Sequence, residues 1–281
     1  MKHSGPSWST TLKRAAVVTY RAGCVGIAKG AAYSALLAFF PVLTTIAVLL
    51  VRFRARAVSQ VMARFLESMV PPGSEDLVLN LFTVRGQRPS AVLIGAVFVS
   101  IYAASGIMLS LIKGFDAVYR VPNRPFLRQR AVAAALVVLA VVPAVAASAL
   151  ILMGGRTERA VLAWMQGVSS ATLTRGGVLL LGQGARIVIT MAASVLSAAM
   201  LYRIAPNRPM RWRDVWDGAF VVTLAWYAAT YCFRFYVANI AAYNVMYGTV
   251  AAVIALGVWL YLLGLIALYG CAVNAVRHGR F

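Results

Sequence analysis

The amino-acid sequence predicts an all-α polytopic membrane protein, a bundle of six transmembrane helices with an amphipathic, non-cytoplasmic helix in the first loop. Of the 281 residues, 62% are hydrophobic and only 12% are charged, whereas a soluble domain is about half apolar and about a quarter charged. The mean hydropathy is +0.80. The apolar residues fall in long runs, and about 20 such residues let a helix cross ~30 Å of hydrocarbon with its own backbone hydrogen bonds satisfied.

The basic residues support the same fold class. The formal net charge is +20, which in a soluble protein would indicate nucleic-acid binding. Here Lys and Arg lie mostly between the apolar runs, as the positive-inside rule and the attraction of anionic headgroups predict. We therefore expect membrane lipids with anionic headgroups as partners, and no nucleic acid.

The N-terminal part of the chain predicts a first span without a signal peptide. Residues 1–29 are basic and mixed, and no small-residue cleavage site follows, so we expect a cytoplasmic N-terminal segment and an uncleaved span at about 30–51. Pro41 in that span would kink the helix or break it locally. In the connection 52–89, apolar residues at helical spacing end at Pro71-Pro72-Gly73, which predicts an amphipathic helix. It would lie at the membrane interface or, alternatively, cover a cavity as a lid.

The remaining apolar runs predict the other spans. Small residues in the second span allow close helix contact, and Pro143 lies in the middle of the third. The connection 154–177 contains a short stretch at 161–168 that would lie at the interface. The six spans are expected at about 30–51, 90–112, 131–153, 178–202, 219–240 and 248–273, within a transmembrane domain of residues 30–275 followed by a cytoplasmic tail, 276–281.

The distribution of Lys and Arg predicts the orientation in the membrane. The N-terminus, the second and fourth connections and the tail together carry more Lys and Arg than the first and third connections. The longest loop also counts for less, because long loops translocate with little regard to charge. Both termini should therefore be cytoplasmic, although Arg52, Arg54 and Arg56 argue against this orientation.

Two hairpins on the predicted cytoplasmic side resemble each other. Tyr119-Arg-Val-Pro-Asn-Arg-Pro125 matches Tyr202-Arg-Ile-Ala-Pro-Asn-Arg-Pro209 when one residue is gapped. One interpretation is a duplicated two-helix unit, related by an axis along the membrane normal as in parallel-repeat transporters. We favour the simpler interpretation that Tyr-Arg is a common interfacial anchor and Pro-Asn-Arg-Pro a common turn.

Three polar residues inside predicted spans are the candidate binding site. Arg186 and Arg234 are the charged residues placed there, and Gln183 shares a helix face with Arg186. An arginine costs ~2.5–3.5 kcal/mol at mid-bilayer and less when its side chain reaches the headgroups, so both could simply extend to the outer headgroups. The functional alternative is that the three side chains face the bundle interior and bind the anionic headgroup of a substrate or lipid. No Asp or Glu falls within a predicted span, so we expect no proton or cation relay.

The cysteines, histidines and acids argue against a metal centre, a cofactor or catalysis. Cys24, Cys232 and Cys271 form no CxxC motif, and His3 and His278 lie at the termini, so we expect no metal and no cofactor. Phosphodiester hydrolysis requires clustered carboxylates or histidines, whereas the seven acidic residues are scattered along the chain. We therefore expect no catalytic residues and no enzymatic activity, ribonuclease activity included.

Three motifs carry a family resemblance. The first is Ala32-Tyr-Ser-Ala-Leu-Leu-Ala-Phe-Phe-Pro41, and the second extends from Leu201-Tyr-Arg203 through Pro206-Asn207 and Arg211-Trp-Arg213 to Gly218. The third combines Tyr243-Asn-Val-Met-Tyr-Gly-Thr-Val-Ala-Ala252 with Trp259-Leu-Tyr261 and Asn274. With these motifs the chain resembles the YihY/BrkB family of bacterial inner-membrane proteins, some of which have carried the name ribonuclease BN. One departure is Val273, where the family more often has an acid.

The resemblance implies a six-helix protein of the bacterial inner membrane, in a family whose names are linked to serum resistance and to envelope lipid export. It also marks a set of family-motif and structural residues. These are Tyr33, Pro41, Tyr202, Arg203, Pro206, Asn207, Trp212, Gly218, Tyr247, Gly248, Trp259 and Asn274.

Two functions from different classes are consistent with these observations. We expect a transporter or flippase-like protein for an anionic amphiphile or lipid of the cell envelope, with gating near Pro41 and Pro143. The alternative is a non-transporting structural or partner-binding envelope protein, whose basic loops hold anionic lipid or another subunit. The sequence leaves open whether the chain forms a homo-oligomer or binds an envelope partner.

Overall fold

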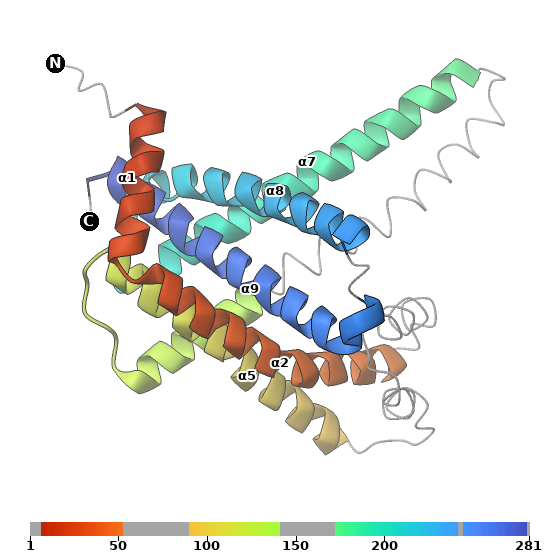
Figure 1. Cartoon of the computed structure of the whole chain (residues 1–281), viewed down its shortest axis with the longest axis horizontal. Coiled ribbons are helices and arrows are strands. Elements are labelled where there is room, and N and C mark those ends of the chain that lie inside the picture. Colours follow the sequence, from red (N-terminus) through yellow and green to blue (C-terminus); the bar gives the residue numbers. More distant parts are fainter. Residues whose placement is uncertain (1–6, 53–89, 141–171, 241–243, 280–281) are drawn as a thin grey trace.

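The computed structural model describes residues 7–52, 90–140, 172–240 and 244–279 (Figure 1). All regular structure in these ranges is helical and none of them contains a strand, which confirms the all-α class. A further helix covers residues 126–140. The named helices are α1 (Trp8–Arg21), α2 (Cys24–Arg52), α5 (Ser90–Val118), α7 (Thr172–Ile204), the short 3-10 helix η1 (Trp212–Asp214), α8 (Trp216–Ile240) and α9 (Asn244–Arg277).

The described helices make this a multi-pass membrane protein. Four segments of them are long and apolar enough to cross a membrane: Cys24–Thr45, Ile94–Val118, Ile187–Ile204 and Val253–Arg277. The expected total of six spans stays a prediction. The expected amphipathic helix in the first loop, Pro143 and the stretch 161–168 lie outside the described residues.

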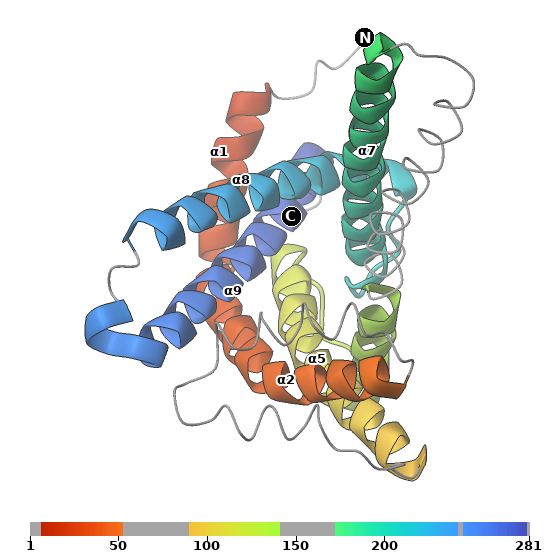
Figure 2. The same ribbon diagram turned by 90° about the vertical axis from the view of Figure 1, so that its right-hand side faces the viewer.

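Helix α9 is the central element of the bundle. It lies between α8 and α2 in both views (Figures 1 and 2), and it also contacts α1 and α5. Helix α7 packs against α8, while its N-terminal half extends away from the other helices (Figure 1). Helices α1, α2, α5 and α8 thus contact α9 directly, and α7 contacts α8. This packing brings residues from distant parts of the chain around a common interior.

Helices α2 and α5 pack along each other through polar as well as apolar groups. The Ser100 hydroxyl donates to the Pro41 carbonyl at 2.6 Å, and the Thr45 hydroxyl donates to the Ala96 carbonyl at 2.9 Å. Hydrogen bonds from Ser and Thr across helices stabilise contacts within lipid and help a helix to tolerate proline. Accordingly α2 continues as a helix through Pro41, and the local break that the sequence suggested as one outcome does not occur.

The segment before the first span contains a helix that the sequence analysis did not predict. Helix α1 runs at a steep angle to α2 and α9 (Figures 1 and 2). Its buried face consists of Thr11, Ala15 and Thr19, and the Tyr269 hydroxyl of α9 donates to the Leu12 carbonyl at 3.1 Å. Gly23, with φ +68°, makes the turn into α2, a conformation that glycine adopts without a steric penalty.

The start of α1 and the end of α9 lie at one end of the bundle, which is called the terminal end from here on (Figure 1). The Arg277 guanidinium of α9 lies 3.8 Å from the centre of the Trp8 ring of α1, and Arg277 pairs with Asp217 of α8 at 2.8 Å. His278 lies near two carboxylates, 3.6 Å from Asp214 and 3.4 Å from Asp217. These contacts join the last turn of α9 to the starts of α1 and α8.

Candidate functional site

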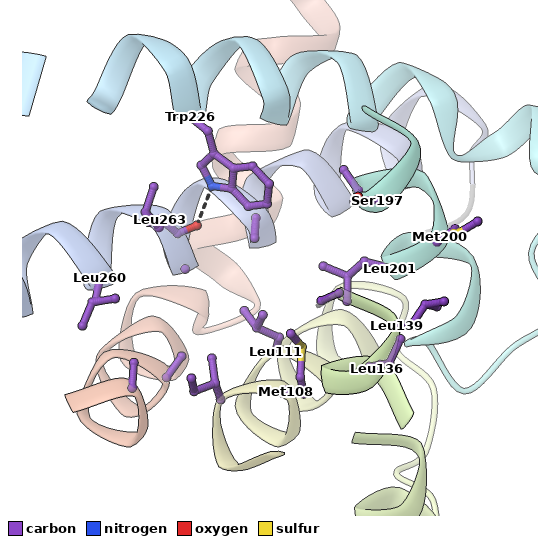
Figure 3. Close-up of a pocket in the computed structure, with 17 residues that line it drawn as sticks. Met108, Leu111, Leu136, Leu139, Ser197, Met200, Leu201, Trp226, Leu260 and Leu263 are labelled. Carbon is purple, nitrogen blue, oxygen red and sulfur yellow. Dashed lines mark hydrogen bonds between the residues drawn. The ribbon is translucent and has the colours of Figure 1, made fainter. Parts of the chain in front are cut away.

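An apolar cavity of about 320 Å³ lies between the helices (Figure 3). Its walls come from α2, α5, the helix of residues 126–140, α7, α8 and α9. This volume is near the lower end of the range of small-molecule pockets, roughly 300–1,000 Å³. The larger side chains that line it include those of Met108, Leu111, Leu139, Leu201, Trp226 and Leu263.

The few polar groups in the cavity wall are bonded within the protein. The Trp226 indole N–H donates to the Leu263 carbonyl at 3.0 Å (Figure 3), and the Ser197 hydroxyl donates to the Ala193 carbonyl at 2.7 Å. Because these donors already have acceptors, the wall offers little to an ion or a strongly hydrated solute. An alkyl chain, which needs apolar contact and no hydrogen bonds, fits this surface.

Small residues create the space. Ala31 and Ala35 of α2 and Gly264 and Ala267 of α9 line the cavity where larger residues would fill it. A Cβ atom at Gly264 would lie 3.7 Å from the Ala31 Cβ and 3.8 Å from the Ala28 carbonyl oxygen, which is ordinary van der Waals contact. A single methyl group therefore fits at position 264, and the further atoms of a larger side chain would press on α2 or enter the cavity that Gly264 lines.

A close-packed layer lies between the cavity and the terminal end. Phe115 and Cys271 lie about one helical turn beyond the cavity residues Leu111 and Ala267, and Tyr202 directly follows Leu201; each of the three is at most 1% exposed. The Phe115 and Tyr202 rings meet edge to face at 5.6 Å, and the Tyr202 hydroxyl donates to the Ala267 carbonyl at 2.8 Å. These buried side chains fill the space between the cavity and the terminal end.

The two similar hairpins bind each other beyond this layer. The Arg124 guanidinium donates to the Ala205 and Pro206 carbonyls at 2.6 Å each and to the Ile204 carbonyl at 3.3 Å. In the opposite direction, the Asn207 side-chain amide donates to the Pro122 carbonyl at 2.8 Å. The loop that ends α5 and the loop that ends α7 are therefore tied together by four hydrogen bonds.

Asp116 is a structural residue that the sequence analysis missed. The second span was predicted to end at about residue 112, which left Asp116 in the connection after it, but Asp116 lies in α5 and is only 1% exposed. One carboxylate oxygen accepts a hydrogen bond from the Asn207 backbone N–H at 2.7 Å, while the other has no hydrogen-bond partner among the described residues. The apolar run that continues through Phe115 and Val118 was the signal that the helix extends past Asp116.

The equivalent arginines of the two hairpins have different contacts. Arg124 binds backbone carbonyls, whereas Arg208, its counterpart in the second motif, lies with its guanidinium 5.4 Å from the centre of the Tyr119 ring. Burial, and after it the neighbouring Cys271 thiol, raises the pKa of Tyr119, so the ring remains neutral beneath the cation. The sequence similarity of the hairpins therefore does not extend to the contacts of these two residues.

Asn274 and Gly218 explain the close approach of α8 and α9. The Gly218 backbone N–H donates to the Asn274 side-chain oxygen at 2.6 Å, and the Asn274 amide donates to the Val215 carbonyl at 3.3 Å. A Cβ atom at Gly218 would collide with the Gly270 carbonyl oxygen and would lie 2.7 Å from the Asn274 side-chain carbon. Both family-motif residues thus serve the packing of α8 on α9 at the terminal end.

The other family-motif residues are distributed over the structure. Trp212 lies beneath the Arg203 guanidinium at 4.2 Å, Trp259 packs against the Phe233 ring at 6.1 Å, and Tyr33 is 64% exposed. Tyr247 and Gly248 belong to the first turns of α9, where side chains lie outside the described part of the structure.

The described structure does not place the predicted headgroup residues together at the cavity. Arg234 lies on α8, where it is exposed, and it is not among the residues that line the cavity. Gln183 and Arg186 lie on α7, but their side chains lie outside the described part of the structure. Their role in headgroup binding stays a prediction.

Comparison with known proteins identifies relatives along most of the chain. A family model described as "Virulence factor BrkB" matches residues 17–281. The "Putative ribonuclease-like protein YfkH" of Bacillus subtilis (strain 168) is 27% identical over 217 residues, which cover 76% of this chain and 76% of that protein. A "UPF0761 membrane protein" of Verminephrobacter eiseniae (strain EF01-2) is 28% identical over 211 residues, 74% of this chain and 47% of the relative.

Another "UPF0761 membrane protein", from Ralstonia nicotianae (strain ATCC BAA-1114 / GMI1000), is 30% identical over 201 residues, which cover 70% of this chain and 41% of the relative. The matched part is therefore about half the length of these UPF0761 relatives or somewhat less. No solved structure matches this chain.

Proposed function

This chain belongs to the virulence factor BrkB family of membrane proteins, and we propose that it binds an anionic amphiphile or lipid and moves it within the cell envelope. The apolar chain of the amphiphile would lie in the cavity, and its headgroup would contact arginine side chains. The protein would be located in the bacterial inner membrane. This is a function of binding and transport, without enzymatic activity.

The observation that carries the proposal is the apolar cavity. Its volume of about 320 Å³ and its internally bonded polar groups suit an alkyl chain better than a hydrated solute. Its walls come from elements that are distant along the chain, so a small change in helix packing alters its shape. Because the cavity is only partly enclosed, the amphiphile would exchange with the membrane through its open side.

The orientation proposed from the sequence is kept. The terminal end would face the cytoplasm, because the basic hairpins, the start of α1 and the end of α9 gather there, and cytoplasmic segments carry an excess of Lys and Arg. Arg186, Gln183 and Arg234 are proposed as headgroup contacts at greater depth, where unpaired arginines are costly and mark functional positions.

The competing proposal is a non-transporting structural or partner-binding protein of the envelope. The hydrogen-bonded hairpins and the many basic side chains of the terminal end favour it, since they would hold anionic lipid or a second subunit without any movement of substrate. In this case the cavity would be a packing feature. Translocation measurements separate the two proposals.

The experiment measures lipid translocation by purified protein in liposomes. A phosphatidylglycerol with a fluorescent acyl chain reports movement between leaflets, because a membrane-impermeant reductant quenches only the outer leaflet. We expect wild type to exceed protein-free liposomes, and we expect Gly264→Leu, which fills the cavity, to lower the rate at least severalfold. Gly95→Leu is the matched control, because Gly95 lies on α5 with open space around it.

Each outcome addresses a different part of the proposal. A wild-type rate equal to that of empty liposomes would reject transport and favour the structural alternative. Equal rates for wild type and Gly264→Leu would reject the cavity as the chain-binding site. Equal rates for wild type, Arg186→Ala and Arg234→Ala would reject these arginines as headgroup contacts while leaving the cavity assignment intact.

A further inference from the structure

A basic hollow lies at the terminal end, apart from the apolar cavity. Arg208, Pro209, Met210 and Arg211 line an open surface depression of about 540 Å³. It belongs to the loop between α7 and α8, and Arg203 at the end of α7 stacks on Trp212 next to it. Two guanidinium groups therefore border one concave surface, with a third close by.

The positive charge of this hollow is not neutralised within the described part of the protein. Among those residues no ion pair joins Arg203, Arg208 or Arg211 to a carboxylate, and the acids of the terminal end have other partners. Asp217 pairs with Arg277 and His278, Asp214 lies near His278, and Asp116 accepts a hydrogen bond from Asn207. The hollow thus attracts anions.

The loop that carries the hollow is held in a fixed conformation. Arg124 donates three hydrogen bonds to its carbonyls, and Asn207, next to Arg208, is bonded to Asp116 and Pro122. Arg208 is itself half-buried, and its guanidinium lies over the Tyr119 ring. Because the loop is already ordered, little conformational entropy is lost when an anion binds here.

Neighbouring aromatic residues place the hollow at the level of lipid headgroups. Trp212 and Trp216 are 40% and 37% exposed and stack on each other at 6.4 Å. Phe220, 56% exposed, continues this aromatic surface along α8. Tryptophan is enriched at the boundary between hydrocarbon and water, so the arginines beside these rings lie where phosphates of the bilayer lie.

We propose that this hollow binds the phosphate group of an anionic membrane lipid. Arg208 and Arg211 would hold the phosphate oxygens, which the planar guanidinium group contacts in bidentate fashion. The lipid chains would remain in the bilayer against Trp212, Trp216 and Phe220. The site does not depend on transport, because it is separate from the cavity and requires no movement of the lipid.

The test measures lipid binding by the full-length protein in detergent micelles with phosphatidylcholine. Phosphatidylglycerol is added, and its affinity is read from the rise in unfolding temperature. We expect the Arg208→Ala/Arg211→Ala double variant to bind roughly fivefold more weakly for each guanidinium removed. The control is Arg14→Ala/Arg128→Ala, which removes the same charge at exposed positions and should keep most of the wild-type affinity.

Three results would overturn the proposal. They are an unchanged phosphatidylglycerol affinity in the Arg208→Ala/Arg211→Ala variant, an equal loss in the control variant, and an equal effect of inorganic phosphate in place of the lipid. The unfolding temperature of each variant in phosphatidylcholine alone shows whether it is folded. If the alanine variant is not folded, Arg208→Gln/Arg211→Gln replaces it, and the same affinities decide the question.

Discussion

Arg124 joins the two hairpins through a single side chain. Its guanidinium group donates to three consecutive backbone carbonyls, those of Ile204, Ala205 and Pro206. These carbonyls belong to the last residue of α7 and the two residues after it, and they have no helical partner of their own. A lysine cannot reproduce the contact, because it lacks the planar fork of donors. The contact between the two hairpins therefore depends on the guanidinium geometry as well as on charge.

Replacing Arg124 with alanine is expected to destabilise the protein by about 2 kcal/mol, since hydrogen bonds from charged donors contribute ~1.5–3 kcal/mol. The measurement is the free energy of unfolding in mixed micelles. Arg128→Ala, at an exposed position of the neighbouring helix, should change it by no more than about 0.5 kcal/mol. If the two variants lose the same stability, the hairpin contact does not stabilise the fold.

At the scale of helices, the crossing of α8 and α9 depends on two glycines that face each other. Gly218 and Gly270 let the backbones approach, as small residues do in membrane helix pairs. Asn274 then supplies the hydrogen bonds that the close approach makes possible, to the Gly218 N–H and the Val215 carbonyl. Asn274 thus stabilises the crossing that the glycines allow.

Gly218→Ala is expected to cost about 2 kcal/mol or more, because the added methyl group collides with the backbone of α9 and overpacking typically costs ~1–3 kcal/mol. Unfolding in mixed micelles measures the loss. Gly95→Ala is the comparison, because nothing lies within 4 Å of its added Cβ and alanine is the better helix former by about 1 kcal/mol. A Gly218→Ala variant as stable as Gly95→Ala would contradict the packing described for α8 and α9.

The membrane class and the family could be predicted from the sequence, because both depend on features that are local along the chain. Apolar runs predict membrane helices, and motifs such as Tyr202-Arg-Ile-Ala-Pro-Asn-Arg-Pro209 are contiguous. The family resemblance is confirmed. Gly218 and Asn274 were marked by the resemblance, but their hydrogen bond joins residues 56 positions apart, which no local pattern indicates.

The cavity and the burial of Asp116 could not be predicted in the same way. The cavity arises where small residues of distant helices meet, such as Ala35 of α2 and Gly264 of α9, and each looks like an ordinary helix-packing residue along the sequence. Asp116 was assigned to a loop because charged residues usually mark the end of a span, whereas here its partner is the backbone of Asn207 in the other hairpin.

At the scale of the whole molecule, the orientation in the membrane can be measured directly. If the terminal end is cytoplasmic, a cysteine introduced at the exposed Ser9 should resist a membrane-impermeant thiol reagent in intact cells and react after lysis. The exposed native Cys232 is replaced by serine in the same variant. Reaction of the introduced cysteine in intact cells would reverse the proposed orientation.

The central claim is that an alkyl chain of a membrane lipid occupies the apolar cavity, and labelling with a photoreactive acyl chain tests it most directly. Purified protein in bilayers that contain a diazirine-bearing lipid is irradiated, and the labelled residues are identified by mass spectrometry. Phe98 and Leu224, 69% and 60% exposed, serve as internal references, because the surrounding lipid reaches them whether or not the cavity is filled.

We expect labels on the cavity residues Met108, Leu139 and Leu201 in wild type. In Gly264→Leu these labels should fall severalfold, while those on Phe98 and Leu224 stay the same. Labels confined to the exposed residues in wild type, or cavity labels that persist unchanged in Gly264→Leu, would contradict the account.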